Sequence, residues 1–159
     1  QIANYKLPPA LAALDWFSSP LLRARETAQL LGVNAASEQA LIEMNWGDWE
    51  GQTLSDLRAR DPQGFAAAEA QGFDLLPPQG ESPRMVAHRV TEWAQMLVSS
   101  STYQALGCVA HKGVIRAIYA QAANWPMLDK PPHALDFHCA QHFIYRDGQW
   151  SIGQLNIAL

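Results

Sequence analysis

Four short segments of the sequence carry side chains that suit the binding or turnover of an anionic group. The first runs from Ser18 to Arg25 and places Ser18, Ser19 and Arg23 at the expected start of a helix. Unpaired backbone N–H groups and the positive end of the helix dipole bind anions there. The guanidinium of Arg23 suits a phosphate or a carboxylate. The pattern predicts an anion-binding cradle, although an ordinary capped helix with solvent-exposed arginines produces the same pattern.

The second segment surrounds Glu43, which lies between the apolar residues Ile42 and Met44. An apolar setting disfavours a charged carboxylate and raises its pKa, which suits a general acid. Asp48 and Glu50 follow next to glycines, where carboxylates are common turn and cap residues. Glu43 is therefore the best candidate for acid–base chemistry here, with a simple turn carboxylate as the alternative.

The third and fourth segments are a loop, Gly80 to Ser82, and the residues around His111. The loop leads into a helix and alone indicates little. His111 ends the apolar run 106–110, and an imidazole at the end of a buried strand can donate to an oxyanion or transfer a proton. A core histidine whose hydrogen bonds are satisfied would fit the same position.

Two other kinds of site fit the sequence less well. His133, His138, Cys139 and His142 are zinc-ligand types. On a strand over 137–145, however, His138 and His142 would lie about 13 Å apart and Cys139 would face the other way. A cysteine hydrolase that uses Cys108 is disfavoured because its apolar neighbours would raise the pKa of the thiol. We expect no metal site.

The elements that must position these residues alternate between strand and helix. A strand over 15–18 leads into a helix with Ser19 as N-cap and Gly32 as terminator, and a buried strand over 106–110, including Cys108, leads into a second helix after Gly113. The longest predicted helix begins at Pro83 and buries one apolar face. A hairpin turns at 147–148. This order predicts an open α/β sheet with its site at the carboxyl ends of the strands.

Length and composition limit the protein class. The 159 residues predict a single domain over 1–159, and 48% hydrophobic with 16% charged residues exclude a disordered chain. A net charge of −4 without a basic run argues against a nucleic-acid partner, and no long apolar stretch indicates a membrane partner. Two cysteines without a disulfide pattern favour the cytoplasm. Since the sequence starts at Gln1 rather than Met, we expect an incomplete N-terminus.

Taken together and in order, the four segments resemble the histidine phosphatase superfamily. The matching stretches are Ser18 to Ala28, Glu43 with 47–51, Gly80 to Ser82, and Ala110 to Arg116. The resemblance implies a three-layer α/β/α sandwich with a mostly parallel sheet, like that of phosphoglycerate mutase. The family's nucleophilic histidine lies in an Arg-His-Gly triplet at the end of the first strand, and this sequence contains no such triplet. We therefore expect the first strand to lie upstream of Gln1.

The resemblance also implies roles for the matching residues. Arg23 would bind the transferring phosphoryl group, with Ser18 in the same cradle, and His111 would stabilise its equatorial oxygens. Glu43 would protonate the leaving oxygen and then activate water. Lys112 stands where the family usually has a small residue, so it would add a phosphate contact or point to solvent. No cofactor is implied, since fixed cations and donors stabilise a phosphoryl group without a metal ion.

The function that this resemblance implies is a metal-independent phosphomonoester hydrolase that forms a phosphohistidine and acts on a small phosphorylated metabolite. The short stretch between Gly51 and Gly80 favours this over a phosphomutase, which is the first alternative. The second alternative is a non-catalytic phospholigand-binding protein, because the 159 residues lack the nucleophile. The oligomeric state cannot be inferred from the sequence.

Overall fold

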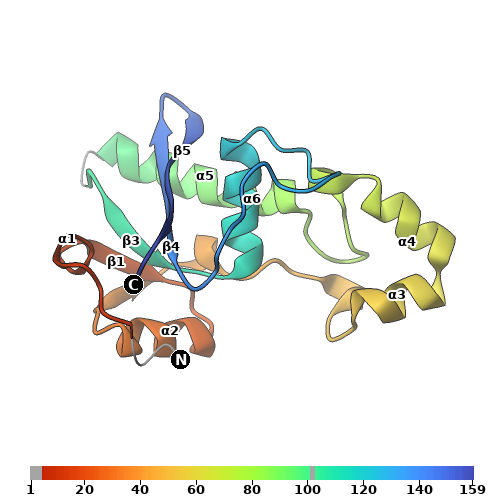
Figure 1. The fold of residues 1–159 in the computed structure, drawn as a ribbon, viewed down its shortest axis with the longest axis horizontal. Helices are drawn as coiled ribbons and strands as arrows, with labels where there is room; N and C mark the ends of the chain where they lie inside the picture. Colours follow the sequence, from red (N-terminus) through yellow and green to blue (C-terminus); the bar gives the residue numbers. More distant parts are fainter. Residues whose placement is uncertain (1–4, 101–102) are drawn as a thin grey trace.

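The computed structural model describes residues 5–100 and 103–159 and places helices on both faces of a small parallel sheet (Figure 1). The strands are β1 (Asp15–Ser18), β2 (Ala35–Ser37), β3 (Leu106–Val109), β4 (Ala140–Arg146) and β5 (Gln149–Ile157). The α-helices are α1 (Pro9–Ala12), α2 (Leu22–Leu30), α3 (Leu54–Arg60), α4 (Pro62–Glu69), α5 (Pro83–Ser100) and α6 (Lys112–Ala122). Short 3₁₀ helices are η2 (Gln39–Leu41), η3 (Gly47–Trp49) and η4 (Gly72–Asp74).

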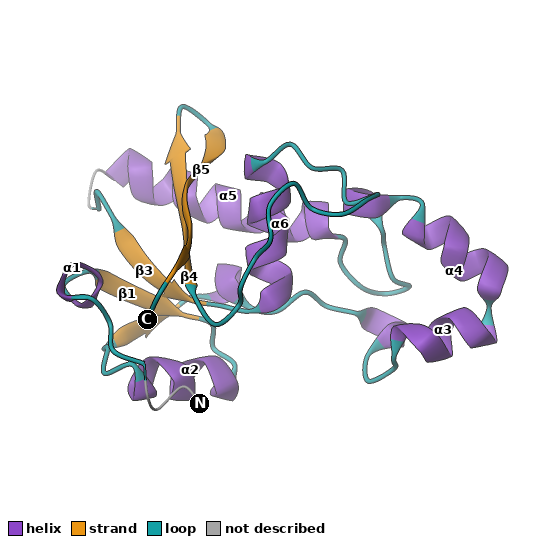
Figure 2. Ribbon diagram, viewed as in Figure 1, coloured by secondary structure: helices purple, strands orange, loops and turns teal. Residues whose placement is uncertain are grey.

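The parallel sheet has the order β2-β1-β3 and lies between two helical layers (Figure 2). Successive side chains of β1 point to opposite faces, as the strand period requires. Trp16 packs with Ala24 and Ala28 of α2 on one face. Phe17 packs on the other face, edge-on against Trp93 of α5 with ring centroids 5.2 Å apart. The expected three-layer α/β/α architecture is therefore confirmed.

The C-terminal strands form a separate antiparallel hairpin. β4 and β5 turn at Asp147 and Gly148, which both have positive φ, so the predicted turn is confirmed. Phe143 and Trp150 pack against the main core, on the side where the hairpin contacts α6. Within the described residues, β3 pairs with β1 alone and β4 with β5 alone.

Helix boundaries agree with the sequence signals in one case and differ in another. α5 begins at Pro83 as predicted, and the Ser82 hydroxyl accepts the Met85 N–H at 3.2 Å. α2 begins at Leu22, so the expectation that Ser19 is its N-cap is wrong. Ser19 instead continues the line of β1, because its N–H donates to the Val109 carbonyl at 2.9 Å.

Two further expectations need correction. Cys108 was expected to be buried, but it is exposed because β3 is an edge strand in the described part of the chain. The strand expected over 137–145 begins at Ala140, since the preceding turn is closed by the Cys139 N–H, which donates to the Asp136 carbonyl. Among the described residues, no helix is long and apolar enough to span a bilayer.

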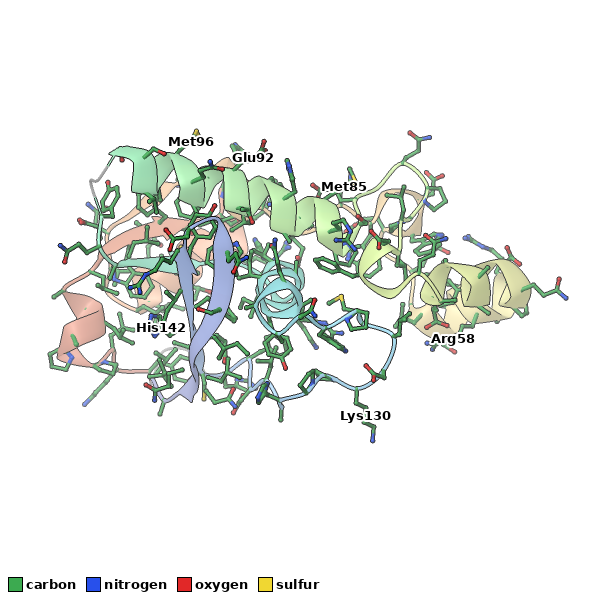
Figure 3. The ribbon with its side chains drawn as sticks, turned by 90° about the horizontal axis from the view of Figure 1, so that it is seen from above. Arg58, Met85, Glu92, Met96, Lys130 and His142 are labelled. Carbon is green, nitrogen blue, oxygen red and sulfur yellow. The ribbon has the colours of Figure 1, made fainter. Side chains whose placement is uncertain are left out.

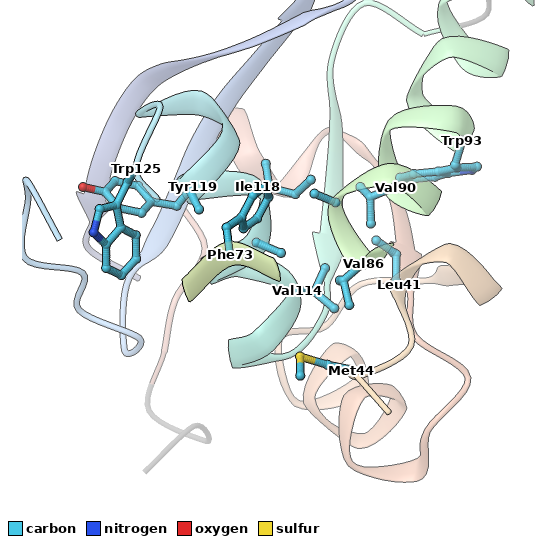
Figure 4. Packing of buried hydrophobic residues seen from close by; sticks show 13 residues of the cluster. Leu41, Met44, Phe73, Val86, Val90, Trp93, Val114, Ile118, Tyr119 and Trp125 are labelled. Carbon is cyan, nitrogen blue, oxygen red and sulfur yellow. The ribbon is translucent and has the colours of Figure 1, made fainter. Parts of the chain in front are cut away.

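The main core lies between α5, α6 and the sheet (Figure 4). Leu41 and Met44 enter this cluster from the segment after β2 and pack near Val86 of α5 and Val114 of α6. The α3–α4 pair projects away from this core, and Arg58 marks it in Figure 3. The packing of Leu41 and Met44 therefore places Glu43, which lies between them, beside the start of α6.

Candidate active site

The candidate site lies where β1 and β3 end and α6 begins. Ser18 and Val109 are in register, and parallel strands end at the same edge of a sheet. Ser19 directly follows β1 and His111 directly precedes α6, so these two residues lie close together. The Nε2 atom of His111 lies 2.8 Å from the Oγ atom of Ser19, and both residues are buried.

Arg23 fixes the protonation state of His111. The Nε of Arg23 donates to Nδ1 of His111 at 3.2 Å. Because a guanidinium nitrogen can only donate, Nδ1 is the acceptor, and Nε2 carries the proton and donates to Ser19. Burial lowers the pKa of His111 below its usual 6.5; the Arg23 and Arg89 charges lower it too, while Glu43 opposes them. The site therefore holds a neutral imidazole at pH 7 beside an exposed guanidinium.

Glu43 lies against the first turn of α6. Its Oε2 accepts the Gly113 N–H at 3.4 Å, and its Oε1 accepts the Met44 N–H at 2.9 Å. A Cβ atom at position 113 would lie 2.4 Å from Oε1, so the carboxylate needs a glycine there. The positive end of the helix dipole favours a negative charge at this place. Glu43 and His111 thus converge on one helix N-terminus.

The backbone after Glu43 packs tightly on the loop before α5. The Asp48 N–H donates to the Pro78 carbonyl at 2.9 Å. Gly47 has φ +52°, and a Cβ atom there would lie 2.1 Å from the same carbonyl oxygen. The loop around Gly80, which alone indicated little in the sequence, is therefore part of the support for the Glu43 segment.

The structure brings together three of the five residues predicted for the site. Arg23 and His111 are in contact. Glu43 contacts Gly113, which follows His111 by two residues in the sequence. Ser18 is buried, and its hydroxyl donates to the Ser19 carbonyl at 3.0 Å. Lys112 is exposed, and its Nζ lies 4.9 Å from the ring centroid of Phe137.

Sequence reasoning missed two residues of the site. Ser19 was expected only as a helix cap, yet it is the hydroxyl that contacts His111. Nothing in the sequence distinguished it from Ser18, because both stand at the strand's end. Gly113 was expected only as a helix boundary, although it contacts Glu43. A glycine inside the first turn of a helix was the available signal, because it often marks a close approach.

The histidines of the zinc alternative have separate partners. His133 Nδ1 lies 3.0 Å from the Tyr119 hydroxyl and His138 Nδ1 lies 3.0 Å from the Tyr5 hydroxyl. His142 lies against Gly153 on the hairpin. Over residues 5–100 and 103–159, no group of three or more His, Cys, Asp or Glu side chains is arranged to hold a metal ion.

Comparisons with known proteins identify the family of the chain. Residues 5–158 match the family model described as histidine phosphatase superfamily (branch 1). The adenosylcobalamin/alpha-ribazole phosphatase of Salmonella typhimurium is 31% identical over 137 residues, which cover 84% of this chain and 63% of that protein. The fructose-2,6-bisphosphatase of Saccharomyces cerevisiae is 26% identical over 125 residues, or 79% of this chain and 27% of that protein. The chain thus spans less than two thirds of these curated relatives.

Solved structures are similar over nearly all of this chain. The structure titled "Mycobacterial hydrolase 1" has a TM-score of 0.74 at 26% identity and covers 94% of this chain and 78% of that one. A mycobacterial glucosyl-3-phosphoglycerate phosphatase in complex with VO3 has a TM-score of 0.69 at 25% identity, with 90% and 76% covered.

Proposed function

The chain belongs to the histidine phosphatase superfamily, branch 1, and on this basis we propose that the protein is a metal-independent hydrolase of small phosphomonoesters. The observation that carries the proposal is the convergence of Arg23, His111 and Glu43 at the N-terminus of α6. A cation, a neutral N–H donor and a carboxylate at one place are the groups that phosphoryl transfer needs, because its catalysis is mostly positioning and electrostatic stabilisation.

Each group has a defined role in the proposed reaction, and Glu43 acts in both of its steps. Arg23 and the Nε2–H of His111 donate hydrogen bonds to the phosphoryl oxygens. For this, the Nε2–H exchanges its hydrogen bond to Ser19 for one to a phosphoryl oxygen. Glu43 enters this step as the carboxylic acid and gives its proton to the leaving alkoxide as the ester P–O bond breaks, which leaves a carboxylate. Family membership implies that a P–N bond to a histidine forms at the same time. Water then attacks phosphorus, gives its proton to Glu43, and breaks the P–N bond.

The proposed reaction does not use any of the five histidines of this sequence as its nucleophile. The family places it in an Arg-His-Gly triplet, and the 159 residues contain none. Ser18 and Lys112 stay as predicted phosphate ligands. The Ser18 hydroxyl donates to a backbone carbonyl whereas the Ser19 hydroxyl contacts His111, which favours Ser19 as the hydroxyl nearest the transferred group. A single domain over 1–159 is part of the same proposal.

The names of the relatives support the substrate class. They are phosphatases of alpha-ribazole derivatives, fructose-2,6-bisphosphate and glucosyl-3-phosphoglycerate, which are small phosphorylated metabolites. We propose the same class here, with a cytoplasmic location that rests on the two free cysteines. A phosphomutase is the second candidate, because a bisphosphoglycerate-dependent phosphoglycerate mutase from Azorhizobium caulinodans is 30% identical over 111 residues.

Phosphate release from alkyl and aryl phosphomonoesters, measured on the full protein in EDTA, tests the proposal. We expect turnover that EDTA leaves unchanged and that falls about 100-fold or more in Glu43→Gln and His111→Gln. Turnover that is stimulated by a bisphosphate primer and exceeds hydrolysis would favour the mutase. Binding of inorganic phosphate that requires Arg23, without any turnover, would overturn the hydrolase in favour of a phospholigand-binding protein.

A further inference from the structure

We infer that Arg89 is a positioning residue for Glu43, acting with Glu81 as a clamp on the backbone on both sides of that carboxylate. The inference rests on the proposed function, because it explains how the proposed acid–base group is held in place. It concerns the stretch from Ala40 to Asn45, which reaches the N-terminus of α6 from the end of η2.

The guanidinium of Arg89 is the first half of the clamp. It extends from α5, and its Nη1 donates to the Ala40 carbonyl, while its Nη2 donates to the Ile42 carbonyl at 2.7 Å. Its Nε donates to Glu81 Oε1 at 3.0 Å, and Nη2 also reaches Oε2 of that residue at 3.3 Å. All three guanidinium nitrogens are therefore used, two of them on the backbone just before Glu43.

Glu81 is the second half and holds the backbone just after Glu43. Its Oε2 accepts the Asn45 N–H at 3.0 Å, and its own N–H donates to the Asn45 carbonyl at 2.8 Å. The two side chains thus fix carbonyl or N–H groups of Ala40, Ile42 and Asn45. Glu43 lies inside this span, one residue from Ile42 and two from Asn45.

The local structure explains why a clamp is needed. Residues 43–46 are neither helix nor strand, so a regular hydrogen-bond ladder does not set their path. A displacement of a reacting group by about 1 Å can reduce the reaction rate about 100-fold. The buried Met44 side chain anchors the segment on one side, and the clamp fixes the backbone from the other.

Burial distinguishes this ion pair from the others in the described part of the chain. The side chains of Arg89 and Glu81 are 20% and 22% exposed, whereas those of Arg84 and Asp74 are 60% and 55% exposed. Exposed ion pairs contribute little to the stability of a structure, because water screens the attraction between their charges. Arg84 also lies on α5, near its start, but it contacts η4 and not the Glu43 segment. Arg84→Gln is therefore a matched control.

The first test compares two leaving groups in the full protein. A general acid is needed for an alkoxide but much less for p-nitrophenolate, which leaves without a proton. For Arg89→Gln we expect kcat/KM, which reports the steps up to departure of the leaving group, to fall about 10- to 100-fold on an alkyl phosphate and by a smaller factor on p-nitrophenyl phosphate. The pattern should match that of Glu43→Gln. Arg89→Lys should give a smaller loss of the same kind, because an ammonium cannot reproduce the planar fork.

The second test needs no activity and separates the clamp from the proposed function. The Gly113 amide resonance reports the bond to Glu43, and we expect Arg89→Gln to move it toward its position in Glu43→Gln. Arg84→Gln should leave both the resonance and the leaving-group pattern as in the parent protein. Equal losses of kcat/KM on the two substrates, or an unmoved Gly113 resonance in a folded Arg89→Gln variant, would overturn the inference. Lack of phosphatase activity with a moved resonance would overturn only the function.

Discussion

At the scale of single residues, His111 is built to stay neutral. Nδ1 accepts from Arg23, so a second proton on the imidazole would have to displace that guanidinium. Burial and the nearby arginines also lower the pKa of His111. The unfolded chain therefore binds the proton more readily than the folded protein, and stability rises with pH across the interval between the two pKa values. The His111 contribution is complete above about pH 6.5 and is lost as the pH falls below it.

This linkage predicts that His111→Gln unfolds with a weaker dependence on pH. Urea unfolding at pH 7.5 and pH 5.5 gives the free energies to compare. The parent protein should lose more stability between these values than the variant, because Gln has no proton to bind. His88→Gln is the control, since the His88 side chain is 72% exposed. An equal loss in the parent protein and in His111→Gln would contradict the prediction.

A second residue-scale prediction concerns Gly113. A Cβ atom at this position would lie 2.4 Å from Glu43 Oε1, so Gly113→Ala must displace the carboxylate. Alanine also favours the helix by up to about 1 kcal/mol, which offsets the loss of stability. Activity on an alkyl phosphate should fall about 10-fold or more, while urea unfolding changes little. Unchanged activity would show that the position of this carboxylate is not critical.

The candidate site was predictable at this scale only in part. Arg23, Glu43 and His111 could be selected as site candidates from the sequence, because their residue types and their neighbours indicate anion binding or acid–base chemistry. The choice between Ser18 and Ser19 could not be made, because it depends on the Ser19 N–H pairing with Val109 across the sheet. The contacts of Arg89 with Ala40 and Ile42 join residues almost fifty positions apart and leave no local sequence signal.

At the scale of elements, local signals set most boundaries. Two boundaries depend on residues within one turn of the chain, so the sequence predicts them. α5 begins at a proline, and α2 is followed by Gly32 with φ +73°. The start of α2 at Leu22 and the start of β4 at Ala140 depend on contacts beyond the immediate neighbours or on an irregular turn. The register shifts of β4 between Ala140 and Phe143 are of the same kind.

The short helix α3 provides the element-scale prediction. Thr53 and Asp56 form a reciprocal cap, in which the Thr53 hydroxyl accepts the Asp56 N–H at 3.1 Å and the Asp56 carboxylate accepts the Thr53 N–H at 3.3 Å. Thr53→Ala should cost about 1 kcal/mol of local stability, seen as faster amide exchange in α3. Phosphatase activity should not change, because α3 projects away from the site (Figure 1). Ser55→Ala, an exposed change in the same turn, should leave exchange unaltered.

At the scale of the whole molecule, one core joins two separate sheets. Phe17 of β1 and Leu106 of β3 pack on the same cluster as Phe143 and Trp150 of the hairpin. The indole N–H of Trp150 also donates to the Thr91 hydroxyl of α5 at 2.8 Å. Since the parallel sheet and the hairpin share no strand pairing in the described chain, side-chain packing on α5 and α6 is what couples them.

This shared core predicts that the parallel sheet and the hairpin unfold as one unit. Ile118 of α6 is 4% exposed within the cluster, so Ile118→Ala should lower the free energy of unfolding by about 2–5 kcal/mol, and Ile118→Val by about 0.5–1.5 kcal/mol. Native-state hydrogen exchange should show the same loss for the slowest amides of β3 and of β5, because a cooperative domain opens as a whole. If β5 kept its protection while β3 lost it, the hairpin would be a separate unit and the single domain over 1–159 would be wrong.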